Sequence, residues 1–199
     1  MQGFNKLAIA LASTAVITAC GGSGGSDNNE TTGGTTTPPA VTATTVSGSA
    51  TKGIISNAQV EVFEILSDGS LSAEAVGEAT TDASGEYEVE LSDSYTGGPL
   101  KVTISAVDGT TMICDAPSGC GSTAYGDNYT LATGFELSAL LPEADGNTVS
   151  VHVTPLTDMA TKLAEEEDTL NVAAIANAND VVRQTLVLQA ILPRLNPLM

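Results

Sequence analysis

Apolar and polar residues alternate along short segments of the chain between Val46 and Thr154. The clearest segments are 58–65, 86–91 and 100–105. Alternation of this kind places one face of a strand in a core and the other face in solvent. Turn residues such as Asp82-Ala83-Ser84-Gly85 separate the segments. Seven or eight short strands at this spacing predict a mainly β fold, an antiparallel β-sandwich over residues 46–154.

Further strands are predicted at 76–81 and 110–114, with one or two weak strands within 130–141. The pair Asp108-Gly109 is a hairpin signal, and it predicts that segment 110–114 pairs with segment 100–105. Segment 148–154 alternates strongly and places Val149, Val151 and Val153 on one face.

The apolar period changes from two to about 3.6 residues after Thr154, which predicts a short C-terminal α-helical segment over residues 155–199. Thr154-Pro155 is a helix start, with Thr as the cap and Pro in the first turn. The first helix is expected to turn a common apolar stripe inward, made of Leu156, Met159, Ala160, Leu163 and Ala164.

A second helix is predicted from Val172 to about Leu188, with Val172, Ile175, Val182 and Leu186 facing inward. The tail 191–199 stays apolar and shows no capping signal. This pattern is typical of a domain that continues past Met199, and a strand or loop docked on the sandwich would give the same pattern.

The first 19 residues form a secretory signal: Lys6 precedes a mostly apolar run, 7–19, that is too short to span a bilayer comfortably. The run ends in Ile17-Thr18-Ala19-Cys20, which resembles the lipobox of bacterial lipoproteins. The resemblance implies cleavage before Cys20 and attachment of fatty acids such as palmitate at its thiol. Gly21 rather than Asp follows Cys20, and by resemblance to enteric lipoproteins this implies an outer-membrane lipoprotein, either periplasmic or surface-exposed.

Residues 20–45 comprise Cys20 and a stretch of Gly, Ser, Thr, Asn and Pro that has almost no apolar residue large enough for a core. Such a composition predicts a flexible tether between the lipid and the sandwich.

The chain contains 24 acidic and six basic residues, a formal net charge of −18. This surface repels nucleic-acid phosphates, so no nucleic-acid partner is expected. Trp is absent and aromatic residues make up 4% of the chain, so stacking platforms for bases or sugars are scarce.

Cys114 and Cys120 are an even pair in an exported chain, which favours a disulfide. The single histidine, His152, shares the polar side of its strand with Ser150 and Thr154. We therefore interpret His152 as a solvated residue rather than a catalytic or zinc-binding one. No catalytic residue is predicted.

The sequence predicts no cofactor and leaves a metal site open, with calcium as the ligand that the many carboxylates suit best. Its candidate loops are 82–86, Asp127-Asn128 and 143–147, and none has EF-hand spacing. Tyr95, Tyr125 and Tyr129 are candidates for sugar binding on loops, whereas Tyr87 is expected in the core.

Residues 46–105 resemble the carboxypeptidase regulatory-like, transthyretin-like sandwich. The resemblance rests on Val46-Ser47-Gly48, on Asn57-Ala58-Gln59-Val60 and on the turn Thr80-Thr81-Asp82-Ala83-Ser84-Gly85-Glu86-Tyr87. In that turn, Asp82 is suited to cap and Gly85 to positive φ. The resemblance implies a fold and brings no catalytic residue.

These observations predict a membrane-anchored lipoprotein with a structural, spacer or adhesive role and no catalysis of its own. Its expected partners are the membrane, through the lipid, and a surface polysaccharide or envelope protein. Two alternatives stay open: a glycan- or calcium-dependent protein-binding module, and an N-terminal fragment of a larger surface enzyme.

Overall fold

The computed structural model describes residues 44–144 and 148–195, with side chains as far as Val187, all within one compact unit, Ala40–Met199. The predicted signal, Cys20 and all but two residues of the predicted tether lie outside the described residues. The first strand, β1, covers Thr45–Ser49 and so begins one residue before the expected boundary.

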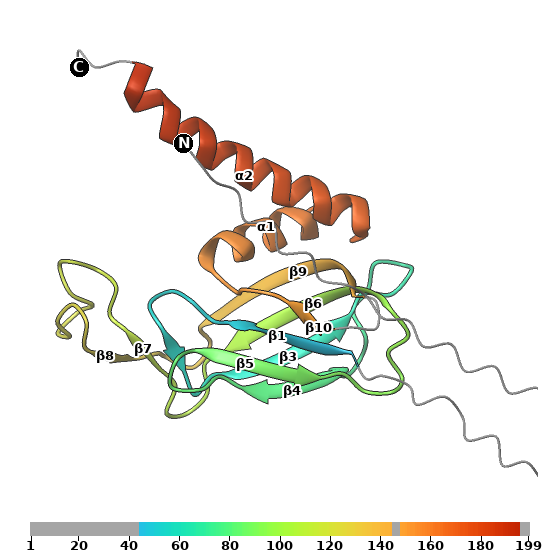
Figure 1. Cartoon of the computed structure of the whole chain (residues 1–199), viewed down its shortest axis with the longest axis horizontal. Helices are drawn as coiled ribbons and strands as arrows, with labels where there is room; N and C mark the ends of the chain where they lie inside the picture. The colour runs from blue at the N-terminus through green and yellow to red at the C-terminus, as the bar shows by residue number, and fades with distance from the viewer. Residues whose placement is uncertain (1–43, 145–147, 196–199) are drawn as a thin grey trace, which may run out of the picture. The chain divides into compact units, whose positions relative to one another are not determined.

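The fold is mainly β, as predicted, and its described strands form three sheets (Figure 1). One sheet has the order β10(Thr148–Ser150), β1, β5(Glu86–Glu90). The larger sheet has the order β4(Gly77–Thr80), β3(Gln59–Glu64), β6(Gly98–Ser105), β9(Glu136–Ala144). A small third sheet has the order β2(Ile55–Ser56), β7(Thr111–Ile113), β8(Asn128–Thr130).

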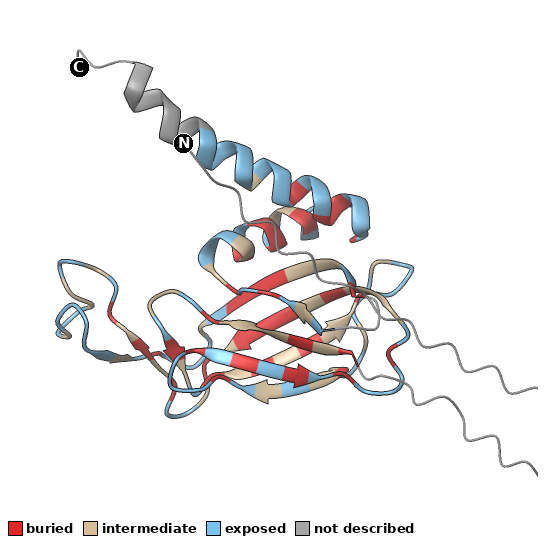
Figure 2. Ribbon diagram, in the orientation of Figure 1, coloured by how far each residue is buried: buried red, intermediate tan, exposed pale blue. Residues whose placement is uncertain are grey.

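The predicted alternation places the core between the β10–β1–β5 sheet and the β4–β3–β6–β9 sheet. On β3, Val60 and Val62 are fully buried while Gln59 and Glu61 are partly exposed, and on β5 Val89 is buried between exposed glutamates. Figure 2 shows the same alternation as bands along the strands. One face of each sheet therefore supplies the apolar core, which confirms the sandwich.

The expected face of segment 148–154 is confirmed: Val151 and Val153, just after β10, are buried, and Val149 on β10 is half-buried and packs against the core. Its pairing departs from a purely antiparallel sandwich, because β10 runs parallel to β1, with Val46 opposite Val149. An isolated bridge between Ala50 and Val153 extends this parallel contact.

The predicted hairpin between segments 100–105 and 110–114 is wrong. The chain does turn at Gly109, where φ is 84°, but β7 then pairs with β2 and β8. The reason is that β3 and β9 occupy both edges of β6, so no edge is left for β7. The hydroxyl of buried Thr110 donates to the backbone oxygen of Asn57 at 2.7 Å and fixes the new direction.

Segment 130–141, where weak strands were predicted, contains most of β9, a nine-residue strand beside β6. Its Leu137, Ser138 and Ala139 are buried. The alternation is weak in the sequence because helices α1(Pro155–Glu165) and α2(Val172–Leu195) contact this strand (Figure 1). A strand that is covered on more than one side need not alternate.

The start of α1 is confirmed: Thr154 is its cap, and a capping box joins Thr154 to Thr157. The Thr157 amide donates to Thr154 Oγ1 at 3.2 Å, and the Thr154 amide donates to Thr157 Oγ1 at 2.8 Å. These bonds satisfy backbone donors that the first turn of a helix leaves free.

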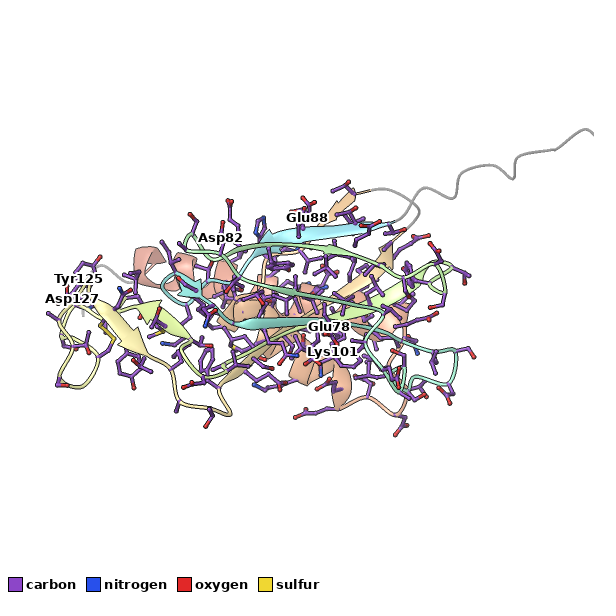
Figure 3. The ribbon with its side chains drawn as sticks, turned by 90° about the horizontal axis from the view of Figure 1, so that it is seen from below. Glu78, Asp82, Glu88, Lys101, Tyr125 and Asp127 are labelled. Carbon is purple, nitrogen blue, oxygen red and sulfur yellow. A yellow bond between two sulfur atoms is a disulfide. The ribbon has the colours of Figure 1, made fainter. Side chains whose placement is uncertain are left out.

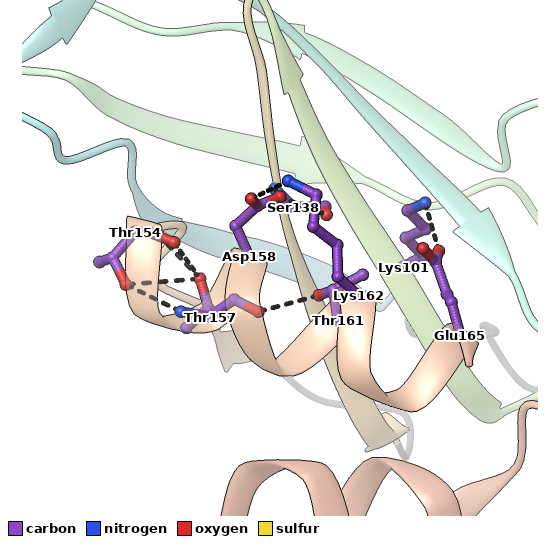
Figure 4. A network of polar contacts seen from close by, with 8 residues as sticks. All are labelled: Lys101, Ser138, Thr154, Thr157, Asp158, Thr161, Lys162 and Glu165. Carbon is purple, nitrogen blue, oxygen red and sulfur yellow. Dashed lines mark hydrogen bonds and ion pairs between the residues drawn. The ribbon is translucent and has the colours of Figure 1, made fainter. Parts of the chain in front are cut away.

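The predicted apolar stripe of α1 is partly wrong. Ala160 and Ala164 are buried, but Leu156 and Met159 are exposed, whereas Asp158 and Thr161 are buried. The stripe is rotated because α1 faces β9 with a polar group: Asp158 Oδ1 accepts from the amide and the hydroxyl of Ser138, both at 3.1 Å (Figure 4).

The second helix begins at the predicted residue and runs further than predicted, to Leu195. Residues 188–192 include Leu, Gln, Ala and Ile, which favour helix, so the tail continues the helix rather than forming a loop. Of the residues expected to face inward, Ile175 is buried and Val182 half-buried, but Val172 and Leu186 are exposed. Residues 196–199 lie outside the described residues.

Candidate functional site

A shallow polar hollow of about 570 Å³ lies on the outer face of the β10–β1–β5 sheet. The strands turn their polar residues outward there because their apolar residues fill the core. Its lining includes side chains from all three strands and the segment after β10: Ser47, Ser49, Glu86, Glu88, Ser150 and His152.

His152 is exposed on this face, as predicted, and its Nδ1 shares a hydrogen bond of 2.9 Å with Ser49 Oγ. Ser49 lies opposite Glu86 in the register of β1 and β5. Among the described residues, no carboxylate is hydrogen-bonded to His152, so its ring lacks the orienting acid that a Ser–His–acid triad requires. The geometry here is that of a solvated polar face.

Tyr87 lies beneath the hollow, with its ring in the core, as expected. Its hydroxyl donates to the backbone oxygen of Val151, and burial raises the pKa of this hydroxyl. Gly48 makes the contact possible: a Cβ at this position would lie 1.7 Å from Val151 O and 2.8 Å from Tyr87 Oη.

The turn 82–86 confirms the roles expected for Asp82 and Gly85. Asp82 Oδ1 accepts from the amides of Ser84 at 2.8 Å and Glu86 at 2.9 Å, and Gly85 has a φ of 75°. One carboxylate oxygen of this candidate calcium loop is therefore already used by its own turn.

The other calcium candidates are dispersed. Asp127 lies on the loop before β8, far from Asp82 in Figure 3. Glu143 is exposed near the end of β9, and residues 145–147 lie outside the described residues. Within 44–144 and 148–195, no three His, Cys, Asp or Glu side chains come together as a metal-binding group.

A disulfide joins Cys114 and Cys120, as predicted, with the two Cα atoms 5.8 Å apart. Cys114 is fully buried, and a turn between Ala116 and Gly119 closes the loop through a 2.8 Å backbone hydrogen bond. The disulfide therefore anchors an exposed loop to the end of the small sheet.

The three tyrosines proposed for sugar binding lie in different environments. Tyr125, beside the disulfide loop, is 65% exposed, and Tyr129 on β8 is half-buried. Tyr95 is buried, and its hydroxyl donates to the backbone oxygens of Gly98 and Ala144. Tyr95 is therefore a packing residue, and it does not present an exposed ring of the kind expected for sugar binding.

The polar network that holds α1 on the sheet was missed by sequence reasoning. Asp158 joins Ser138 to Lys162, and Lys101 Nζ on β6 contacts Glu165 Oε1 at 2.7 Å (Figure 4). An Asp at the fourth position of a predicted amphipathic helix was the available signal, but it is equally typical of an exposed first turn.

Within the described residues, neither helix combines the length and the hydropathy that crossing a bilayer requires. Comparison with family models finds no match, and comparison with curated proteins finds none. Among solved structures, the chain is similar to a crystal structure of a 9R-lipoxygenase from Cyanothece PCC8801, at 16% identity and a TM-score of 0.31. The match covers 86% of this chain and 27% of the lipoxygenase chain.

Proposed function

We propose that the chain is a lipid-anchored lipoprotein of the bacterial outer membrane, with a structural, spacer or adhesive role and no catalysis of its own. The anchor is the thiol of Cys20, and the sandwich is of the carboxypeptidase regulatory-like, transthyretin-like type. Domains that this sandwich resembles serve as rigid spacers, adhesin repeats and accessory modules, so the resemblance brings no catalytic residue.

The observation that carries the proposed role is the disulfide-closed loop at one end of the sandwich. Its cysteines fix the loop to the small sheet, and Tyr125 beside it exposes most of its side chain. Figure 3 shows Tyr125 and Asp127 together at this end of the domain, away from the other labelled residues. A rigid, exposed loop suits contact with an envelope polysaccharide or protein.

The anchor is tested by expressing the full chain in bacteria with a clickable fatty-acid probe. We expect labelled protein in the membrane fraction, and loss of the label in Cys20→Ser. The matched control is the double variant Cys114→Ser/Cys120→Ser, which keeps Cys20 and should keep the label. A labelled Cys20→Ser chain, or an unlabelled unmodified chain, would overturn the proposed anchor.

A glycan- or partner-binding module is the second candidate, favoured by the exposed ring of Tyr125. Aromatic rings supply contact area at little entropic cost when they are already ordered. Saturable retention of the chain on an immobilised polysaccharide, lost in Tyr125→Ala, would favour this second candidate over a passive spacer.

A further inference from the structure

Residues 114–127, which connect β7 to β8, project beyond the end of the two larger sheets (Figure 1). We call this segment, which includes the disulfide, the β7–β8 loop. Nine of its fourteen residues are exposed, and Cys114 is its only buried residue. Exposure on this scale marks a convex surface, because the walls of a cleft would cover part of its lining.

Backbone hydrogen bonds and the disulfide hold the β7–β8 loop in a defined conformation. Its ends continue the pairing of β7 with β8: the Cys114 amide donates to Asp127 O at 2.9 Å, and the Gly126 amide donates to Cys114 O at 2.9 Å. In its middle, Cys120 and Thr123 exchange backbone hydrogen bonds of 2.9 and 3.1 Å, and the disulfide ties Cys120 to Cys114. Because folding has already ordered this backbone, a partner that binds the loop does not have to order it.

Tyr125 lies at the corner of a tight turn within the loop. The turn runs from Ala124 to Asp127, and a 3.2 Å hydrogen bond from the Asp127 amide to Ala124 O closes it. Gly126 has a φ of 86°, as the third residue of a type II turn requires. The Tyr125 side chain is 65% exposed, more than any other large apolar side chain among the described residues. A ring presented in this way is suited to be the central contact of an interface.

The composition of the β7–β8 loop resembles that of loops that bind other proteins. Six of its fourteen residues are Gly, Ser or Tyr. In antigen-binding loops, Tyr supplies rigid contact area at low entropic cost, while Gly and Ser let the partner approach the backbone and form hydrogen bonds. Projecting loops of this kind insert into concave surfaces of their targets.

The charge of the loop indicates the charge of its partner. Asp115 lies 3.9 Å from Lys52 Nζ, and both side chains are well exposed, so this pair contributes little to stability. Asp127 is exposed and forms no ion pair with a described residue. Figure 3 shows Asp127 next to Tyr125. A complementary surface therefore combines a site for an aromatic ring with a positive charge at its edge.

We propose that the β7–β8 loop inserts into a pocket of another protein of the cell envelope, with Tyr125 filling the pocket and Asp127 facing Lys or Arg at its rim. The proposal rests on the export of the chain proposed above. A protein fits this loop better than a polysaccharide, because a sugar chain gains affinity by lying in a cleft. The loop is convex and presents one exposed ring, since Tyr129 on the adjoining strand is half-buried.

The proposal is tested with the full chain in the bacterium that encodes it. The photoreactive residue benzoylphenylalanine replaces Ser122, an exposed residue of the loop, and irradiation joins it to molecules in contact. We expect an adduct of one discrete mass that protease digests. Benzoylphenylalanine at Leu71, which is 36% exposed in the loop between β3 and β4, is the matched control and should not give this adduct. No adduct at Ser122, or a smear that polysaccharide hydrolases remove, would overturn the proposal.

A second set of variants tests whether Tyr125 is the central contact. Tyr125→Ala should lower the yield of the adduct at least about tenfold, and Tyr125→Phe, which keeps the ring, should retain it. Neither change affects the core, because the side chain is exposed. An adduct equally strong in Tyr125→Ala would overturn the proposal.

The fatty-acid label on Cys20, measured in the same cells, separates this proposal from the proposed lipid anchor. A labelled chain without the adduct would overturn the contact of the β7–β8 loop and leave the anchor standing. An unlabelled chain that still gives the Tyr125-dependent adduct would support the contact and overturn the anchor.

Discussion

Tyr87 joins the core to the parallel strand pair through one hydroxyl group. Its ring is buried among apolar residues, and its hydroxyl donates to Val151 O just beyond β10. The contact depends on Gly48, because any side chain there would collide with the same backbone oxygen. A phenol held in this way must stay protonated, since the ionised form would be buried without a counter-charge.

Stability should therefore fall at high pH through Tyr87. Burial raises the pKa of Tyr87 above its ordinary value of about 10, so the folded chain keeps a proton that the unfolded chain releases. Its contribution is complete below about pH 10 and is lost as the pH rises above that value, by up to about 1.4 kcal/mol per pH unit. Urea denaturation from about pH 9 to pH 11 measures this slope.

Tyr87→Phe should flatten that slope and cost about 1 kcal/mol near pH 7, because the hydrogen bond to Val151 is lost. The matched control is Tyr125→Phe, which removes the hydroxyl of an exposed tyrosine and should leave both quantities unchanged. An identical pH slope in Tyr87→Phe and the unmodified unit would show that the loss of stability at high pH does not come from Tyr87.

A single polar side chain, Asp158, joins α1 to β9. β9 is an edge strand, and an open edge invites pairing with other chains. Asp158 reaches this edge and accepts a hydrogen bond from the Ser138 amide. This amide is therefore not free to pair with another strand. Pro142 removes a further donor from the same strand. The helix thus covers an edge as well as contributing to a core.

Asp158→Ala should destabilise the domain by about 1–3 kcal/mol, because it leaves the buried amide and hydroxyl of Ser138 without their acceptor. Asp158→Asn keeps one acceptor oxygen and should recover part of the loss. Urea denaturation measures both, with Glu166→Ala as a control for an exposed acid beside the same helix. Equal stability in Asp158→Ala and Glu166→Ala would show that the contact to β9 contributes nothing.

Sequence patterns predicted where strands and helices lie better than they predicted which of them pack or pair together. Alternation located β3, β5 and β6, and the capping signal located the start of α1, because these depend on neighbours in the chain. The pairing of β7 with β2 and β8, and the inward turn of Asp158, depend on which edges distant strands leave open. At the candidate site, the disulfide and the exposed His152 were predicted, whereas the burial of Tyr95 was not.

At the scale of the molecule, the acidic side chains within 44–144 and 148–195 do not come together as a metal-binding group. On β5 the glutamates at 86, 88 and 90 all face solvent, and neither Asp82 nor Asp127 has other acids converging on it in a metal-binding group within the described residues. A charge of −18 then acts mainly as self-repulsion, which any added salt reduces. Because these acids form no metal-binding group, one measurement can distinguish general charge screening from specific calcium binding.

Calcium and magnesium should raise the melting temperature of the unit 40–199 equally at matched ionic strength, because screening depends on charge and concentration rather than on the identity of the cation. Thermal melts in about 5 mM of either chloride, with EDTA as the reference, test this. A calcium site occupied at 100 times its Kd would add about 2.7 kcal/mol, a further shift of about 5–10 °C with calcium alone. Such a shift would contradict the prediction and favour a calcium-dependent binding module. Equal shifts would support a role that needs no bound calcium.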